Sequence, residues 1–127
     1  MAHILVIEDD QLLSSLIAQR LSDAGHEVEA AYTGEQAIES VGKNPPDLVL
    51  LDILLPGKNG YEILHELKAN ESTSKVPVIV LSNLGQKEDI DKAMSEGADD
   101  YMVKVNFTPK EILEKVRQFL GKKESGI

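Results

Sequence analysis

Short runs of apolar, often β-branched residues alternate along the chain with segments whose apolar residues recur every three or four positions. This alternation predicts successive strand–helix units around a parallel sheet. We expect five strands, at His3–Ile7, Glu27–Ala31, Asp47–Asp52, Val76–Ser82 and Asp99–Lys104. The first, third and fourth are nearly continuously apolar, as strands covered on both faces are, whereas the second, EVEAA, alternates and suits an edge.

The stretches between these strands carry the apolar period of a helix. Two capping-box patterns, at Thr33–Gln36 and Thr108–Glu111, mark helix starts, and Asp10 is suited to cap the first helix. The expected fold class is therefore α/β, an open five-stranded parallel sheet with helices on both faces. In such sheets the ligand site lies beyond the carboxyl ends of the strands, where the strand order reverses.

Composition and charge narrow the function classes. The chain has 127 residues, 42% of them hydrophobic, which suffices for one domain with its own core. Its formal net charge is −9 and no basic stripe occurs, so direct nucleic-acid binding is not expected. No apolar run approaches the roughly 20 residues of a membrane-spanning helix, so no membrane insertion is expected either. A strand starts almost at the N-terminus, which predicts no signal peptide, and the lack of Cys fits a reducing cytoplasm.

Polar residues stand at the carboxyl ends of four predicted strands, namely Glu8 and Asp9, Asp52, Ser82, and Lys104. Carboxylates that meet at one edge repel one another unless a cation neutralises them. Mg²⁺ is a hard ion that takes one or two carboxylates and keeps several waters. Taken singly, each acid is a solvated turn residue, Ser82 a loop hydroxyl, Lys104 a solvated amine and Tyr101 a packing residue. Their joint placement favours a shared chemical function.

Four segments, ILVIEDD, LVLLDILLPGKNGYE, VPVIVLS and GADDYMVK, resemble the receiver domain of bacterial response regulators. The resemblance covers essentially Ile4 to Leu120, which places a receiver domain at 1–121 and a polar, frayed tail at 122–127. It implies a doubly wound, flavodoxin-like sheet of strand order 2-1-3-4-5 with five helices. It also implies a cytoplasmic phosphoacceptor that is not an enzyme, apart from slow loss of its own phosphoryl group.

The resemblance assigns a role to each site residue. Asp52 is the phosphoacceptor, and the implied Mg²⁺ ligands are Asp9, Asp52, the backbone carbonyl of Leu54 and, mainly through water, Glu8. The implied switch hydroxyl is Ser82, the switch aromatic is Tyr101, and Lys104 pairs with the phosphoryl group. Phosphorylation would then change the surface formed by the fourth helix, the fifth strand and the fifth helix.

The same resemblance implies the partners. A sensor histidine kinase or a histidine phosphotransfer protein would supply the phosphoryl group, and an output protein or output domain would read the changed surface. The chain is either a stand-alone regulator or a receiver from a longer protein. A phosphorylation-dependent homodimer is left open, because Glu111 and Lys115 are spaced to pair on one face of the last helix, a place that resembles the charged dimer face of some receivers.

Some positions depart from the family pattern. Val105 follows Lys104 where the family usually has a proline after a cis bond. A cis bond before Val would cost about 2.5–4 kcal/mol, so we expect a trans bond and a locally rearranged loop. Asn83 follows the switch hydroxyl where a small residue is usual, and Asn59 stands where the family often has Asp in a turn.

Leu54 and Leu84 occupy the two positions that tune phosphoryl lifetime in the family, two residues after the acceptor and two after the switch hydroxyl. Neither side chain can orient an attacking water, which predicts slow autodephosphorylation.

Three alternatives remain in view. A degenerate receiver would bind partners without phosphorylation, and the changes at Asn83 and Val105 favour it slightly. A dehalogenase-like phosphatase would also use an aspartyl nucleophile, but it typically has a second carboxylate where this chain has Leu54, and a cap domain. A flavodoxin-like nucleotide or flavin carrier would need a Gly-rich phosphate loop, whereas the acidic EDDQ follows the first strand.

Overall fold

Strands and helices alternate along the whole chain in the computed structural model, which describes residues 2–57 and 59–125. In chain order the elements are β1 (His3–Ile7), α1 (Gln11–Asp23), β2 (Glu27–Ala31), α2 (Gly34–Lys43), β3 (Leu48–Leu51), α3 (Gly60–Ala69), β4 (Val78–Ser82), α4 (Lys87–Ser95), β5 (Asp100–Val103), the 3₁₀ turn η1 (Lys104–Asn106) and α5 (Pro109–Ser125). The strands are parallel and lie in the order β2-β1-β3-β4-β5. The predicted fold class and strand order are therefore confirmed.

The strand bounds agree closely with the sequence pattern. Strands β1 and β2 have the predicted bounds, while β3 and β5 are one residue shorter at each end and β4 begins two residues later. Pro77 has no N–H to donate, so the regular ladder of β4 begins at Val78. Lys104 already belongs to η1 rather than to β5.

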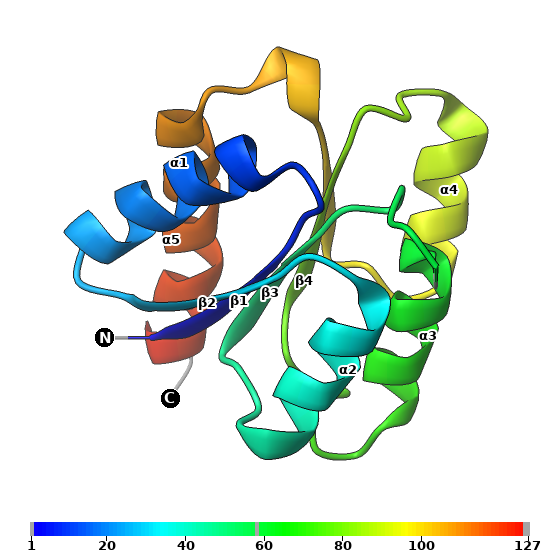
Figure 1. Cartoon of the computed structure of the whole chain (residues 1–127), viewed down its shortest axis with the longest axis horizontal. Coiled ribbons are helices and arrows are strands. Elements are labelled where there is room, and N and C mark those ends of the chain that lie inside the picture. The colour runs from blue at the N-terminus through cyan, green and yellow to red at the C-terminus, as the bar shows by residue number, and fades with distance from the viewer. Residues whose placement is uncertain (1, 58, 126–127) are drawn as a thin grey trace.

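Two apolar cores lie on opposite faces of the sheet. Figure 1 shows α1 and α5 on one face and α2, α3 and α4 on the other. Successive side chains of a strand point to opposite faces, so Leu5 and Ile7 enter the core under α2, α3 and α4, whereas Ile4 and Val6 enter the core under α1 and α5. This division explains why the central strands are apolar at every position.

Side-chain caps fix where the helices begin. The Asp10 side chain accepts a hydrogen bond from the Leu13 amide, as predicted for the cap of α1. Thr108 and Glu111 form a reciprocal capping box at the start of α5. Asn59 caps α3 by accepting from the Glu62 amide, which gives this departure from the family pattern a structural role.

Helix α5 ends later than expected. The polar tail was expected to begin at residue 122, but the helix continues to Ser125, and residues 126 and 127 lie outside the described part of the chain. Gly121 costs helix stability without ending the helix, because no proline or other breaker follows it before Ser125. In the described range, no helix is long and apolar enough to cross a membrane.

The charged residues of α5 pair differently from the expectation. Lys115 Nζ lies 2.9 Å from a carboxylate oxygen of Asp100 on β5, while the Glu111 carboxylate accepts from the Thr108 amide. The i,i+4 spacing made a pair within the helix feasible, but the neighbouring strand and the helix cap supply other partners.

Candidate functional site

Three acids meet at the carboxyl edge of the sheet. Glu8 and Asp9 follow β1 and Asp52 follows the adjacent strand β3, where the strand order reverses. Each offers a carboxylate oxygen, and these oxygens lie within 4.8 Å of one another. Glu8 and Asp52 are only 1% and 3% exposed, whereas Asp9 is exposed to solvent. The arrangement is a half-buried acidic cluster at the predicted position.

Both carboxylate oxygens of Asp52 are fixed. Its Oδ1 accepts a hydrogen bond from the Leu54 amide at 3.1 Å, and its Oδ2 accepts one from Lys104 Nζ at 2.8 Å. The Asp52 amide itself donates to the Ile7 carbonyl of β1 at 2.9 Å. The orientation of this carboxylate is therefore set by the sheet, by the following loop and by a lysine from the far end of the chain.

Lys104 reaches two of the acids. Its Nζ lies 2.5 Å from Glu8 Oε1 as well as 2.8 Å from Asp52 Oδ2. No cis peptide bond occurs in the described residues, so the bond to Val105 is trans as expected, and η1 is the local rearrangement. Burial by itself would lower the pKa of Lys104, but the hydrogen bonds and charges of Asp52 and Glu8 outweigh it, and the pKa is raised. The lysine therefore stays charged.

Glu8 is the most buried acid of the cluster. Its Oε2 accepts from the Asp10 amide at 3.0 Å, while its buried Oε1 has no hydrogen bond of good geometry despite the nearby Lys104 ammonium. Burial raises the pKa of Glu8 to about 7, although Lys104 and the Asp10 amide favour the charged form. Three carboxylates, one with an incompletely satisfied buried oxygen, form an all-oxygen donor set that fits a hard divalent cation such as Mg²⁺.

Leu54 enters the site through its backbone. The Leu54 amide donates a hydrogen bond to Asp52 Oδ1, and Leu54 is 55% exposed to solvent. The predicted role of its carbonyl as a metal ligand stays a prediction.

Ser82 and Tyr101 are linked through a residue that lies between them. Ser82, fully buried at the end of β4, accepts at its Oγ from the Leu84 amide at 3.2 Å. The Tyr101 hydroxyl donates to the Leu84 carbonyl at 2.5 Å, and burial raises the pKa of Tyr101. The sequence had singled out Leu84 only for its side chain, because backbone hydrogen bonds leave no residue-type signal.

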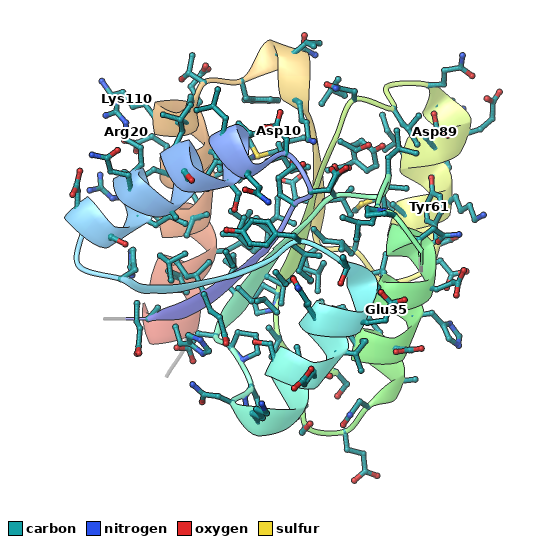
Figure 2. All side chains as sticks on the ribbon, viewed as in Figure 1. Asp10, Arg20, Glu35, Tyr61, Asp89 and Lys110 are labelled. Carbon is teal, nitrogen blue, oxygen red and sulfur yellow. The ribbon has the colours of Figure 1, made fainter. Side chains whose placement is uncertain are left out.

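Helix α4 is held to α3 largely by polar contacts. Of its nine residues only Ala93 is buried. The Tyr61 hydroxyl donates to the Asp89 carbonyl at 3.3 Å, and Lys92 Nζ lies 4.3 Å from the centroid of the Tyr61 ring. Figure 2 labels Tyr61 and Asp89 where the two helices adjoin. A helix with so little buried apolar surface can shift at modest cost.

The family of this chain follows from its similarity to known proteins. Residues 4–117 match the response regulator receiver domain. The chain belongs to this family. A curated relative, the DNA-binding dual master transcriptional regulator RpaA of Synechocystis sp., is 37% identical over 120 residues, covering 94% of this chain and 49% of the relative. This receiver domain thus spans about half the length of the curated relatives it matches.

Solved receiver structures share the fold closely. A CheY-like response regulator receiver domain protein from Methanospirillum hungatei superimposes with a TM-score of 0.91 at 27% identity, covering 100% of this chain and 99% of that one. The Mn²⁺-bound form of response regulator Rcp1 superimposes with a TM-score of 0.84 at 25% identity, covering 94% of each chain.

Proposed function

We propose that Asp52 is the phosphoryl acceptor of a two-component phosphorelay. One observation carries this proposal: the 3% exposed Asp52 carboxylate is held at both oxygens, beside two further acids and Lys104, at the switch point of a receiver fold. A merely structural acid at a strand end has no need of such a setting. The chain then acts as a stoichiometric acceptor rather than as an enzyme.

The reaction is a transfer between two nucleophiles. An oxygen of the Asp52 carboxylate attacks the phosphorus of a phosphohistidine on a partner kinase or phosphotransfer protein. An O–P bond forms as the N–P bond breaks, and the imidazole leaves with the bonding electron pair. Lys104 contributes its positive charge to a phosphoryl oxygen, since phosphoryl transfer depends mainly on positioning and charge stabilisation.

A divalent cation at the acidic cluster completes the proposal. Asp9 and Asp52 would bind Mg²⁺ directly, with Glu8 acting through water and Leu54 through its carbonyl. When bound, the ion supplies charge compensation for the incoming phosphoryl group. The Mn²⁺-bound form of Rcp1 supports a metal in a related receiver domain.

The output would pass through Ser82, Leu84 and Tyr101. A phosphoryl group on Asp52 offers a charged acceptor to which the Ser82 hydroxyl can donate, and turning the side chain toward it would draw Oγ away from the Leu84 amide, now 3.2 Å away. The Leu84 carbonyl also accepts a hydrogen bond from the Tyr101 hydroxyl, so a shift of Leu84 would move the Tyr101 side chain. Helix α4, which buries only Ala93, would then shift with it. We propose that the surface of α4, β5 and α5 is thereby presented to an output protein, an output domain or a second copy of the chain.

Labelling with a small phosphodonor tests this function. Incubation with acetyl phosphate and Mg²⁺ is expected to add one phosphoryl group per chain, measured by intact mass. Excess EDTA should prevent the labelling, because it withdraws Mg²⁺. Hydroxylamine should release the label from chains already phosphorylated, because it cleaves an acyl phosphate. Labelling that persists in EDTA or resists hydroxylamine would contradict the proposal, and no labelling at all would favour the degenerate receiver. After donor removal the label should decay slowly, since neither Leu54 nor Leu84 can orient a water.

Three exposed apolar residues lie close in the chain to site residues. Leu12 in the first turn of α1, Leu54 after β3 and Val105 after β5 are 72%, 55% and 81% exposed. We propose that these side chains contact a protein partner where it docks beside the carboxyl edge of the sheet. A phosphohistidine presented on that partner would then reach Asp52.

Leu12→Glu is therefore expected to slow phosphoryl transfer from a cognate histidine kinase by about tenfold or more, because a charge replaces an apolar contact. Labelling by acetyl phosphate should be unchanged. Met94→Glu is the matched control, since Met94 is also exposed but lies in the last turn of α4. Equal slowing in both variants, or slowing with acetyl phosphate too, would contradict this docking surface.

A further inference from the structure

We propose that Glu8 is a positioning residue that holds the Lys104 ammonium at the phosphoryl site while Asp52 gives up its own charge. The inference rests on the proposed phosphoacceptor function. It assigns Glu8 a role separate from the metal, which the acidic cluster by itself does not suggest.

The backbone that carries Lys104 does little to place its ammonium. Residues 104–106 form a single 3₁₀ turn without a side-chain cap. Val105, the next residue, is 81% exposed, and Asn106 is exposed as well. A lysine ammonium sits on a flexible four-carbon stem, so its position in the site depends on the groups that bind it.

Among the described residues, the carboxylates that bind this ammonium belong to Glu8 and Asp52. The contact to Asp52 loses its charge attraction in the reaction, because the attacking carboxylate becomes part of an uncharged acyl linkage. The contact to Glu8 is not, because Glu8 takes no part in the bond changes. As the phosphoryl group arrives, Glu8 is therefore the protein carboxylate left to keep Lys104 within reach of it.

Glu8 is itself well anchored for this role. Its backbone amide donates to the Ala31 carbonyl of β2 at 3.0 Å, and its Oε2 accepts from the Asp10 amide at 3.0 Å. These two bonds direct the remaining oxygen, Oε1, to within 2.5 Å of Lys104 Nζ. Because Glu8 is 1% exposed, bulk water does not compete with the lysine for this oxygen.

The length of the side chain is part of the inference. Glu8→Asp keeps a carboxylate beside the metal position but draws it back by one methylene. Such a variant separates the reach to Lys104 from the mere presence of a negative charge. Glu8→Gln removes the charge and keeps the length.

A double-mutant cycle on the labelling rate tests the coupling. The rate with acetyl phosphate is measured at saturating Mg²⁺ for the wild type, Glu8→Gln, Lys104→Ala and the double variant, with Mg²⁺ affinities determined by calorimetry. Glu8→Gln and Glu8→Asp are each expected to lower the rate about tenfold in the wild-type background, about 1.4 kcal/mol. In the Lys104→Ala background Glu8→Gln should change nothing further, since the residue it acts through is gone.

Effects that multiply in the double variant would overturn the inference, as would a wild-type rate in Glu8→Asp. The proposed function fails separately: it fails if the wild type takes no label, and only the inference fails if the wild type is labelled and the cycle is multiplicative.

A second measurement needs neither metal nor phosphodonor. With ¹⁵N-labelled lysine, the Nζ resonance of Lys104 should be slow to exchange and distinct in the wild type and in Asp52→Asn, where Glu8 alone holds the ammonium. It should merge with the solvent-exposed lysines when Glu8→Gln is added to Asp52→Asn. A Lys104 resonance that is unchanged in this double variant would overturn the inference even if the variants label poorly.

Discussion

Replacing Asp52 with asparagine is expected to reduce labelling by acetyl phosphate in Mg²⁺ to the background level. An amide is too weak a nucleophile to form the acyl phosphate, and it also removes one oxygen anion from the acidic cluster. The shape of the side chain is nearly unchanged, so the sheet and its two cores should remain intact by circular dichroism. Mg²⁺ should raise the melting temperature of the wild type more than that of the variant, because the ion stabilises the fold only where it binds.

Asp91→Asn is the matched control for this experiment. Asp91 is an exposed acid on α4, so its replacement changes the net charge by the same amount without touching the site. It should label at the wild-type rate. Undiminished labelling of Asp52→Asn would sink the assignment of the acceptor, whichever other residue took up the phosphoryl group.

Gly60→Ala is expected to lower the free energy of unfolding by about 3 kcal/mol, the upper end of the usual cost of overpacking. A Cβ at this position would lie 2.4 Å from the Ile53 Cα and 2.5 Å from the Asp52 carbonyl oxygen. Both are backbone atoms, so no side-chain rotation relieves the clash. The 2.8 Å hydrogen bond from the Gly60 amide to the Ile53 carbonyl holds the start of α3 in this close approach.

The clash should also reach the site, because the atoms in the way belong to the acceptor and its neighbour. Urea unfolding of Gly60→Ala measures the stability, and acetyl phosphate labelling at a temperature where it is folded measures the local effect. Gly42→Ala in α2 is the control, since a Cβ there meets nothing within 4 Å. It should stabilise the chain by about 0.5–1 kcal/mol, as Gly-to-Ala changes inside helices do. Equal stability of Gly60→Ala and the wild type would show that the start of α3 is not packed tightly against the backbone of Asp52 and Ile53.

Much of the site was predictable because strand ends are predictable. Asp52, Glu8 and Asp9 follow apolar runs, and the ends of adjacent parallel strands must meet at one edge. The resemblance of the four motifs to receiver domains then assigned a role to each residue, and the family membership and fold are confirmed. Some element bounds differ from the sequence pattern, as at the end of α5, which continues to Ser125 although its last residues carry no apolar period to read.

Other features had no sequence signal at all. Ser82 and Tyr101 are linked through the backbone amide and carbonyl of Leu84. Every residue has these groups, except that proline lacks the N–H, so they leave no trace in the sequence. The contacts between α3 and α4, including Tyr61 with Lys92, join residues whose spacing along the chain follows no local rule. Lys115 likewise took a partner from β5 that the spacing within its own helix could not reveal.

The sequence by itself determined the α/β class, the five strands, the starts of three helices and the acidic edge around Asp52. Those features follow from local periodicity, capping residues and the obligatory alignment of parallel strands. The tertiary structure alone decided that Lys104, despite the missing proline, places its ammonium between Glu8 and Asp52. It also decided that Gly60 must press on the backbone of the acceptor. These contacts join parts of the chain whose mutual distances are set only when the helices pack on the sheet.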